Sequence, residues 1–106
     1  MSDSLDPTRF DAEVLQADGP VVVDFSTRWC APCRALREAL PEALGQVPAV
    51  AVLHVDATAW PQLAQRYNVR SVPTLVAFKD GRVTGASAGF SGSRRLVAFL
   101  EASARA

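Results

Sequence analysis

The chain has 106 residues, the length of one domain, and with 49% hydrophobic and 21% charged residues its composition is that of a globular protein. Eleven basic residues balance eleven acidic ones, so the charge predicts no broad contact with nucleic acid or an anionic membrane. The start, MSDSLDPTRFD, has no apolar signal region, and no apolar run approaches the about 20 residues that span a bilayer. We therefore expect a single domain, 1–106, that is monomeric and cytoplasmic.

The first half of the chain predicts a helix, two strands and a long helix between the strands. Apolar residues recur at helical spacing over residues 6–18, and the Gly-Pro pair at residues 19–20 stops this helix. Residues 20–25 form an apolar run that one Asp interrupts, which is typical of a strand buried on both faces, and residues 49–56 predict a second buried strand. The long helix is predicted from Leu36, Leu40, Ala43, Leu44 and Val47. Pro41 interrupts this series and should kink the helix or end it early.

The second half predicts a helix, a hairpin and a final helix. Residues 59–67 have helical spacing, with a Pro in the first turn. Residues 73–78 and 83–88 predict two strands, and the Asp-Gly pair within residues 79–82 is a strong signal for a hairpin turn. The last helix is predicted from Leu96, Val97, Phe99 and Leu100. The resulting order, α-β-α-β-α-β-β-α, predicts an α/β fold, a three-layer sandwich whose mixed sheet has helices on both faces.

Both cysteines, Cys30 and Cys33, stand between a predicted strand and the start of the long helix. At a helix start, unpaired amide groups and the helix dipole favour negative charge, so this position favours the nucleophilic thiolate form of Cys30. Cys33 lies three residues on, on the same helical face, within reach to resolve a mixed disulfide. Pro32 fits the first helical turn without losing a needed hydrogen bond. The stretch WCAPC therefore favours thiol–disulfide exchange.

Other roles for the two thiols stay open at this point. A zinc site needs about four ligands, and the one further soft candidate is His54, in the middle of a predicted strand. A metal cluster shared between two chains would use one such pair from each. Inert buried thiols are disfavoured by the position at the helix start and by the adjacent Trp29. A permanent disulfide is not expected in a reducing cytosol, and we expect no metal and no cofactor.

Three stretches, "VVVDFSTRWCAPCR", "YNVRSVPTLVAFKDGRV" and "GFSGSRRLVAFL", in this order and at these spacings, resemble the thioredoxin family. The similarity runs from about residue 6 to residue 104. It implies the thioredoxin fold, with a central mixed sheet of four to five strands, and a redox-active disulfide between Cys30 and Cys33. It further implies that the chain reduces disulfide-containing protein substrates, with thioredoxin reductase as a candidate electron donor.

The resemblance assigns catalytic roles to three residues. Cys30 attacks the substrate disulfide, Cys33 resolves the mixed disulfide, and Asp24 accepts the proton of Cys33. Asp24 is the one charge in a predicted buried strand. Burial disfavours the charged form of a carboxyl group, which suits a group that takes and returns a proton near neutrality.

The resemblance also implies a substrate groove around the sulfur atoms. In the family, the proline before the third strand is cis and faces the cysteines, while the backbone of the preceding residue pairs with the substrate like an added strand. We carry these roles over to Pro73 and Val72. The residues implied to contact substrate are Trp29, Pro32, Val72, Pro73, Gly89 and Phe90.

Five departures from the family pattern stand out. Ala31 replaces the usual Gly between the cysteines. Ser26 replaces the usual Trp, and we expect this smaller side chain to loosen the packing near the site. Val52 stands where a Lys often pairs with the buried Asp, so that carboxyl group loses a cation. Pro41 lies about three residues later than usual. Residues 1–5 are a poor substitute for the apolar first strand, which we expect to be short, frayed or absent.

Three functions are in competition at this stage. The leading hypothesis is a reducing thiol–disulfide oxidoreductase. The second, within the same chemistry, is an oxidase or isomerase with a higher redox potential. The third is a binding or holdase module in which the groove around Val72, Pro73 and Phe90 matters and the thiols do not.

Overall fold

The residues described by a computed structural model, 4–106, contain one mixed sheet in the strand order β2-β1-β3-β4. Its strands are β1 (Val21–Ser26), β2 (Ala51–Asp56), β3 (Thr74–Lys79) and β4 (Arg82–Ala88). β1 pairs in parallel with β2 and antiparallel with β3, and β3 pairs antiparallel with β4. The parallel pair is joined by a helical crossover, as the β-α-β pattern predicts.

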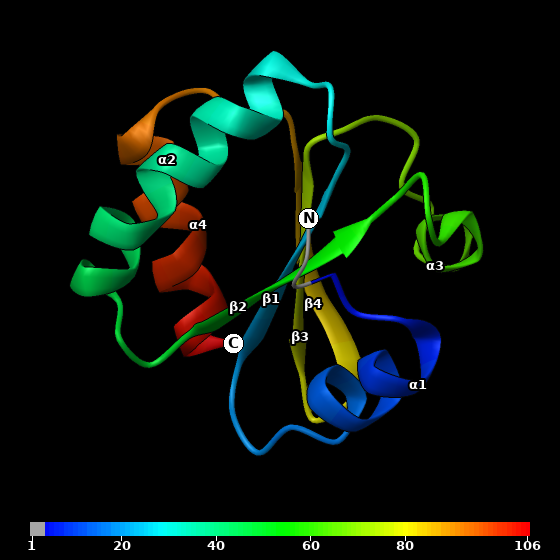
Figure 1. Cartoon of the computed structure of the whole chain (residues 1–106). Coiled ribbons are helices and arrows are strands. Elements are labelled where there is room, and N and C mark those ends of the chain that lie inside the picture. The colour runs from blue at the N-terminus through cyan, green and yellow to red at the C-terminus, as the bar shows by residue number, and fades with distance from the viewer. Residues whose placement is uncertain (1–3) are drawn as a thin grey trace.

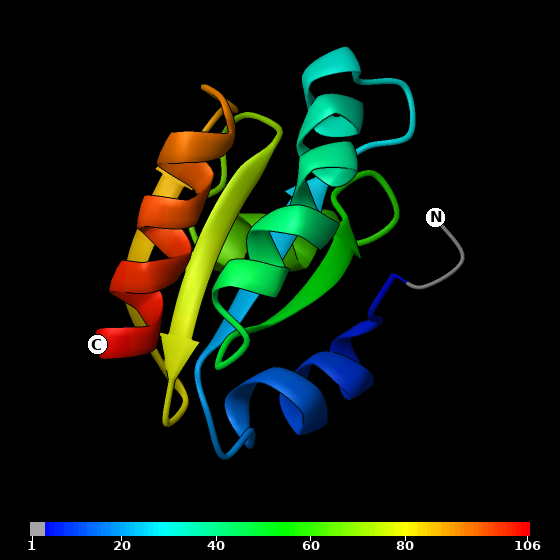
Figure 2. The ribbon, with the colours of Figure 1, turned by 90° about the vertical axis from the view of Figure 1, so that its left-hand side faces the viewer.

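Helices cover both faces of this sheet (Figure 1). α1 (Pro7–Phe10) continues into a π-helical turn, η1 (Asp11–Leu15), and these lie on one face together with α3 (Pro61–Arg66). α2 (Ala31–Gln46) and α4 (Ser93–Arg105) cover the other face, side by side (Figure 2). The predicted three-layer sandwich with the thioredoxin fold is confirmed.

β1 is the centre of the core because both of its faces are buried. Val23 and Phe25 pack into the cluster under α1 and α3, whereas Val22 packs into the cluster under α2 and α4. Side chains alternate along a strand. Asp24 and Ser26 therefore point to the same side as Val22, toward α2.

β2 is less buried than its apolar sequence predicts. The prediction of a second buried strand is wrong, because β2 lies at the edge of the sheet and Val55 is its one fully buried residue. The N-terminal segment covers part of this edge: the Leu5 N–H donates to the His54 carbonyl at 2.8 Å, and the Asp56 N–H donates to Ser4 Oγ at 2.7 Å. Leu5 itself is buried. Of the expected first strand, residues 4 and 5 form no strand, and residues 1–3 lie outside the described part of the chain.

α2 does not end at Pro41. The helix continues to Gln46, with Pro41 on its exposed face. The prediction that Pro41 could end the helix early is therefore wrong. The apolar side of the helix buries Leu36, Leu40 and Ala43 against the sheet. This burial outweighs the one backbone hydrogen bond that a proline removes.

The predicted hairpin turn joins β3 and β4. Asp80 has a φ of 53° and Gly81 a φ of 78°, the pair of positive values that a two-residue hairpin turn requires. The C-terminus lies near this turn, where Lys79 Nζ donates to the Ala106 carbonyl oxygen at 2.8 Å.

Candidate active site

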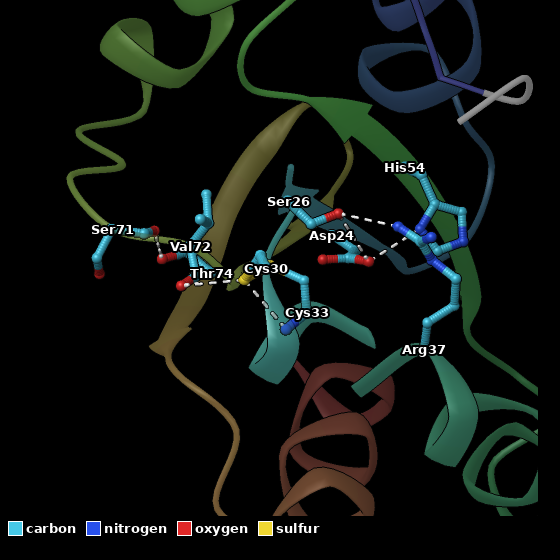
Figure 3. Close-up of a disulfide and its surroundings, with 9 residues drawn as sticks. All are labelled: Asp24, Ser26, Cys30, Cys33, Arg37, His54, Ser71, Val72 and Thr74. Carbon is cyan, nitrogen blue, oxygen red and sulfur yellow. Dashed lines mark hydrogen bonds and ion pairs between the residues drawn. A yellow bond between two sulfur atoms is a disulfide. The ribbon is translucent and has the colours of Figure 1, made fainter. Parts of the chain in front are cut away.

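A disulfide joins Cys30 and Cys33 at the start of α2, and their Cα atoms are 5.2 Å apart (Figure 3). Cys30 is the N-cap of the helix, and its Sγ accepts the Cys33 N–H at 3.2 Å. Cys30 is partly exposed, whereas Cys33 is 1% exposed and faces the sheet together with Leu36. The two sulfur atoms therefore differ in their access to a substrate.

The loop before β3 brings two of the predicted groove residues to the disulfide. The Val72–Pro73 bond is cis, as expected, and the Val72 carbonyl oxygen lies 3.9 Å from Cys30 Sγ. The Gly89 N–H donates to the Pro73 carbonyl oxygen at 2.7 Å. Val72, Pro73 and Gly89 are thus connected to one another and to Cys30.

The other predicted groove residues differ in exposure. Trp29 is 87% exposed, and the Arg28 guanidinium lies 5.9 Å from the centroid of its ring. Pro32 is exposed in the first turn of α2. Phe90 is half-buried and packs against the cluster under α2 and α4, so part of its surface belongs to the core.

Asp24 is fully buried on the side of β1 that faces α2. Its Oδ2 lies 2.9 Å from His54 Nδ1 and accepts the Ser26 hydroxyl at 3.5 Å. Among the described residues its Oδ1 has no hydrogen-bond partner. Figure 3 shows the carboxyl group pointing toward His54, with the cysteine pair on its other side.

The group that pairs with Asp24 differs from the one that the family pattern suggests. Val52, where the family often carries Lys, packs into the cluster under α2 and α4. The partner is His54, which the parallel register places opposite Asp24 on the neighbouring strand. From the sequence, His54 is a candidate only for metal binding. A register that aligns Val21 with Ala51 would have revealed the pair, since both residues stand three positions further along.

Ser26 and Arg37 extend the polar contacts of Asp24. Ser26 is fully buried, and its Oγ accepts the Nη2 group of Arg37 at 3.4 Å. Arg37 reaches this position from the exposed side of α2 (Figure 3). The Ser26 hydroxyl thus connects the Asp24 carboxylate to the Arg37 guanidinium group.

Over residues 4–106, no three His, Cys, Asp or Glu side chains gather as a metal site requires. No helix in this range has the length and apolar character that crossing a bilayer demands.

The sheet, its two helical layers and a cysteine pair at the start of α2 define a thiol–disulfide oxidoreductase. A family model described as Thioredoxin matches residues 2–102. The chain is 43% identical to the thioredoxin of Rhodospirillum rubrum, covering 89% of this chain and 91% of that protein. It is 40% identical to thioredoxin C-2 of Corynebacterium nephridii (87% and 86% covered) and 38% identical to the thioredoxin of Pseudomonas aeruginosa (88% and 87% covered).

The chain therefore belongs to the thioredoxin family. It is a protein-disulfide reductase that works through the Cys30–Cys33 pair on disulfide-containing proteins. The two other functions that the sequence left open, a higher-potential oxidase or isomerase and a binding module, are not favoured by these relatives.

Proposed function

We propose that Cys30 is the nucleophile of this reductase and Cys33 the resolving thiol. The observation that carries this assignment is the difference in exposure: Cys30 is partly exposed, and Cys33 is 1% exposed. After reduction, the Cys33 N–H that contacts Cys30 Sγ at 3.2 Å and the N-terminus of α2 stabilise a thiolate on Cys30. A bulky substrate disulfide meets this sulfur first.

The reaction has two exchange steps. The Cys30 thiolate attacks one sulfur of the substrate disulfide, which forms a mixed disulfide and releases the first substrate thiolate. Cys33 then gives up its proton and attacks Cys30 Sγ, so the bond between Cys30 and the substrate breaks and the second substrate thiolate leaves. Two electrons pass from the dithiol to the substrate, and the protein ends with the Cys30–Cys33 disulfide.

Asp24 takes the proton of Cys33 in the second step. Both side chains lie in the layer between β1 and α2, and both are buried, so bulk water is a poor competitor for that proton. The Oδ1 atom, which lacks a hydrogen-bond partner among the described residues, is the acceptor. Such an uncompensated buried oxygen is costly for a fold, which supports a functional reason for its presence.

The substrate chain docks beside the disulfide, along Val72 and Pro73. The support is the 3.9 Å contact of the Val72 carbonyl with Cys30 Sγ, which places this backbone at the reacting sulfur. Trp29, with its large exposed ring, and Pro32 form the rim on the side of α2. Gly89 and the exposed part of Phe90 form the opposite rim.

The proposal also covers the partners and the setting of the protein. The domain, 1–106, acts as a monomer in the cytoplasm and receives electrons from thioredoxin reductase. The support is the similarity over most of the chain to proteins named thioredoxin. Supplying NADPH and thioredoxin reductase tests the donor: continuous reduction of insulin disulfides is expected, and a single turnover that then stops would contradict it.

The residue roles are tested by three variants in the insulin assay. Cys30→Ser should abolish reduction, and Cys33→Ser should accumulate the mixed disulfide, which non-reducing electrophoresis detects. Asp24→Asn should slow resolution about 100-fold, the lower range for a general acid–base group, and remove one pH-dependent step. Full activity of Cys30→Ser, or an unchanged pH–rate profile of Asp24→Asn, would show that these roles are wrong.

A further inference from the structure

The contact between Asp24 and His54 connects a fully buried carboxyl group to the edge of the sheet. Asp24 is 0% exposed, and the His54 side chain is 24% exposed. Their atoms Oδ2 and Nδ1 lie 2.9 Å apart, a short hydrogen-bond distance. A proton on Asp24 therefore has a neighbour that reaches solvent.

The fold holds His54 in this place through β2. In the parallel register His54 lies directly opposite Asp24, on the same face as Val52, whose side chain packs under α2 and α4. β2 is the outer strand and the His54 side chain is 24% exposed. Figure 3 shows the second ring nitrogen of His54 on the side of the ring away from Asp24. With Nδ1 directed at Asp24, Nε2 is the ring nitrogen that can exchange a proton with water.

Several charged groups surround this pair. On the α2 side, Arg37 reaches the Ser26 hydroxyl, which in turn donates to Asp24. On β2 itself, Asp56 is engaged with the N–H groups of Thr58 and Ala59. In the N-terminal segment that lies along β2, the Asp6 carboxylate accepts the Arg9 N–H. The carboxylates of Asp56 and Asp6 thus accept backbone N–H groups, whereas His54 contacts Asp24.

We propose that His54 is a proton relay that links Asp24 to solvent during the resolving step. The inference rests on the proposed roles of Asp24 and Cys33. Cys33 transfers its proton to Asp24 as it attacks Cys30 Sγ. Asp24 passes a proton to His54 Nδ1 while Nε2 releases one to water, and the departing substrate thiolate takes up a proton from solvent. Because His54 acts through Asp24, it is a positioning residue and not a catalytic one.

The relay makes a prediction that a merely structural contact does not. In His54→Asn, an amide group takes the place of Nδ1 beside Asp24 and can still form a hydrogen bond with the carboxyl group, but it cannot carry a proton onward. We expect this variant to keep the stability of the parent protein, yet to resolve the mixed disulfide about tenfold more slowly. The expected loss is smaller than for Asp24→Asn because Asp24 can still exchange its proton slowly. Val52→Ala, two residues earlier on the same face of β2, is the matched control: it adds no polar group near Asp24 and should react at the parental rate.

The measurement is single-turnover reduction of insulin disulfides between pH 5 and pH 9, with circular dichroism melts to confirm folding. A second variant, His54→Ala, is measured with added imidazole, which should restore the rate through the space left at the sheet edge. Imidazole should not restore Asp24→Asn. Parental rates and an unchanged pH profile in His54→Asn, or no response of His54→Ala to imidazole, would overturn the relay.

The outcomes separate this inference from the function on which it rests. If the parent protein fails to reduce insulin, or Asp24→Asn resolves normally, the assigned roles of the site residues are wrong. If Asp24→Asn is slow and His54→Asn is not, the site roles stand and only the relay is wrong.

Discussion

Leu5→Ala tests whether the N-terminal segment is part of the stable fold. Leu5 is 1% exposed and belongs to the cluster under α1 and α3, although it lies outside any strand. The substitution removes three carbons, worth about 0.8 kcal/mol each when buried. The full range for Leu→Ala in cores is about 2–5 kcal/mol. Because the segment lies close to the chain end and can close part of the space, we expect a loss of about 2–3 kcal/mol.

Urea unfolding followed by circular dichroism measures this loss. A domain of this size loses at least about 4 °C in Tm per kcal/mol, so thermal melts should fall by about 10 °C. Val83→Ala is the control, because Val83 is 50% exposed and its truncation should change the free energy of unfolding by less than about 0.5 kcal/mol. If Leu5→Ala also lowers the free energy of unfolding by less than about 0.5 kcal/mol, the reasoning is refuted. The N-terminal segment would then not cover the outer edge of β2 in solution.

Three further substitutions test the rim of the substrate groove, the helix α2 and the backbone at Gly89. Trp29→Ala should leave stability within about 0.5 kcal/mol, because the ring is 87% exposed, and lower kcat/KM for insulin about tenfold or more; an unchanged kcat/KM would remove Trp29 from the groove. Pro41→Ala should raise the free energy of unfolding by about 1–2 kcal/mol, since α2 regains a backbone hydrogen bond on an exposed face; a lower value in urea titrations would contradict this. Gly89→Ala should cost about 1 kcal/mol by the same titration, because its φ is 80° while the added Cβ meets no atom within 4 Å; a neutral change would be inconsistent with that backbone conformation.

Much of the fold was predictable because its signals are local. Continuous apolar runs marked β1 and β3, helical spacing marked α2 and α4, and the Asp80-Gly81 pair marked the hairpin. These signals depend on neighbours along the chain and on the burial of one face. The cysteine pair was predictable for the same reason, since its helix-start position is a local property.

The features that escaped prediction depend on contacts between distant segments. β2 is exposed because it is the outer strand of the described sheet. An apolar run in the sequence does not tell whether a strand lies at the edge or in the middle of a sheet. The Asp24–His54 pair follows from the register of two strands 30 residues apart. The missing Lys at Val52 is visible in the sequence, but the register that brings His54, two residues later, to Asp24 is not.

The position of the C-terminus has a practical consequence for handling this protein. β3 runs antiparallel to β1, so its last residue, Lys79, lies at the end of the sheet where β1 begins, and Ala106 is bonded to it. The cysteines follow the opposite end of β1. A surface tether or an affinity tag joined after Ala106 would therefore leave Cys30 facing away from the support, whereas Ser4 and Leu5, at the other end of the described chain, contact the edge of β2 at Asp56 and His54.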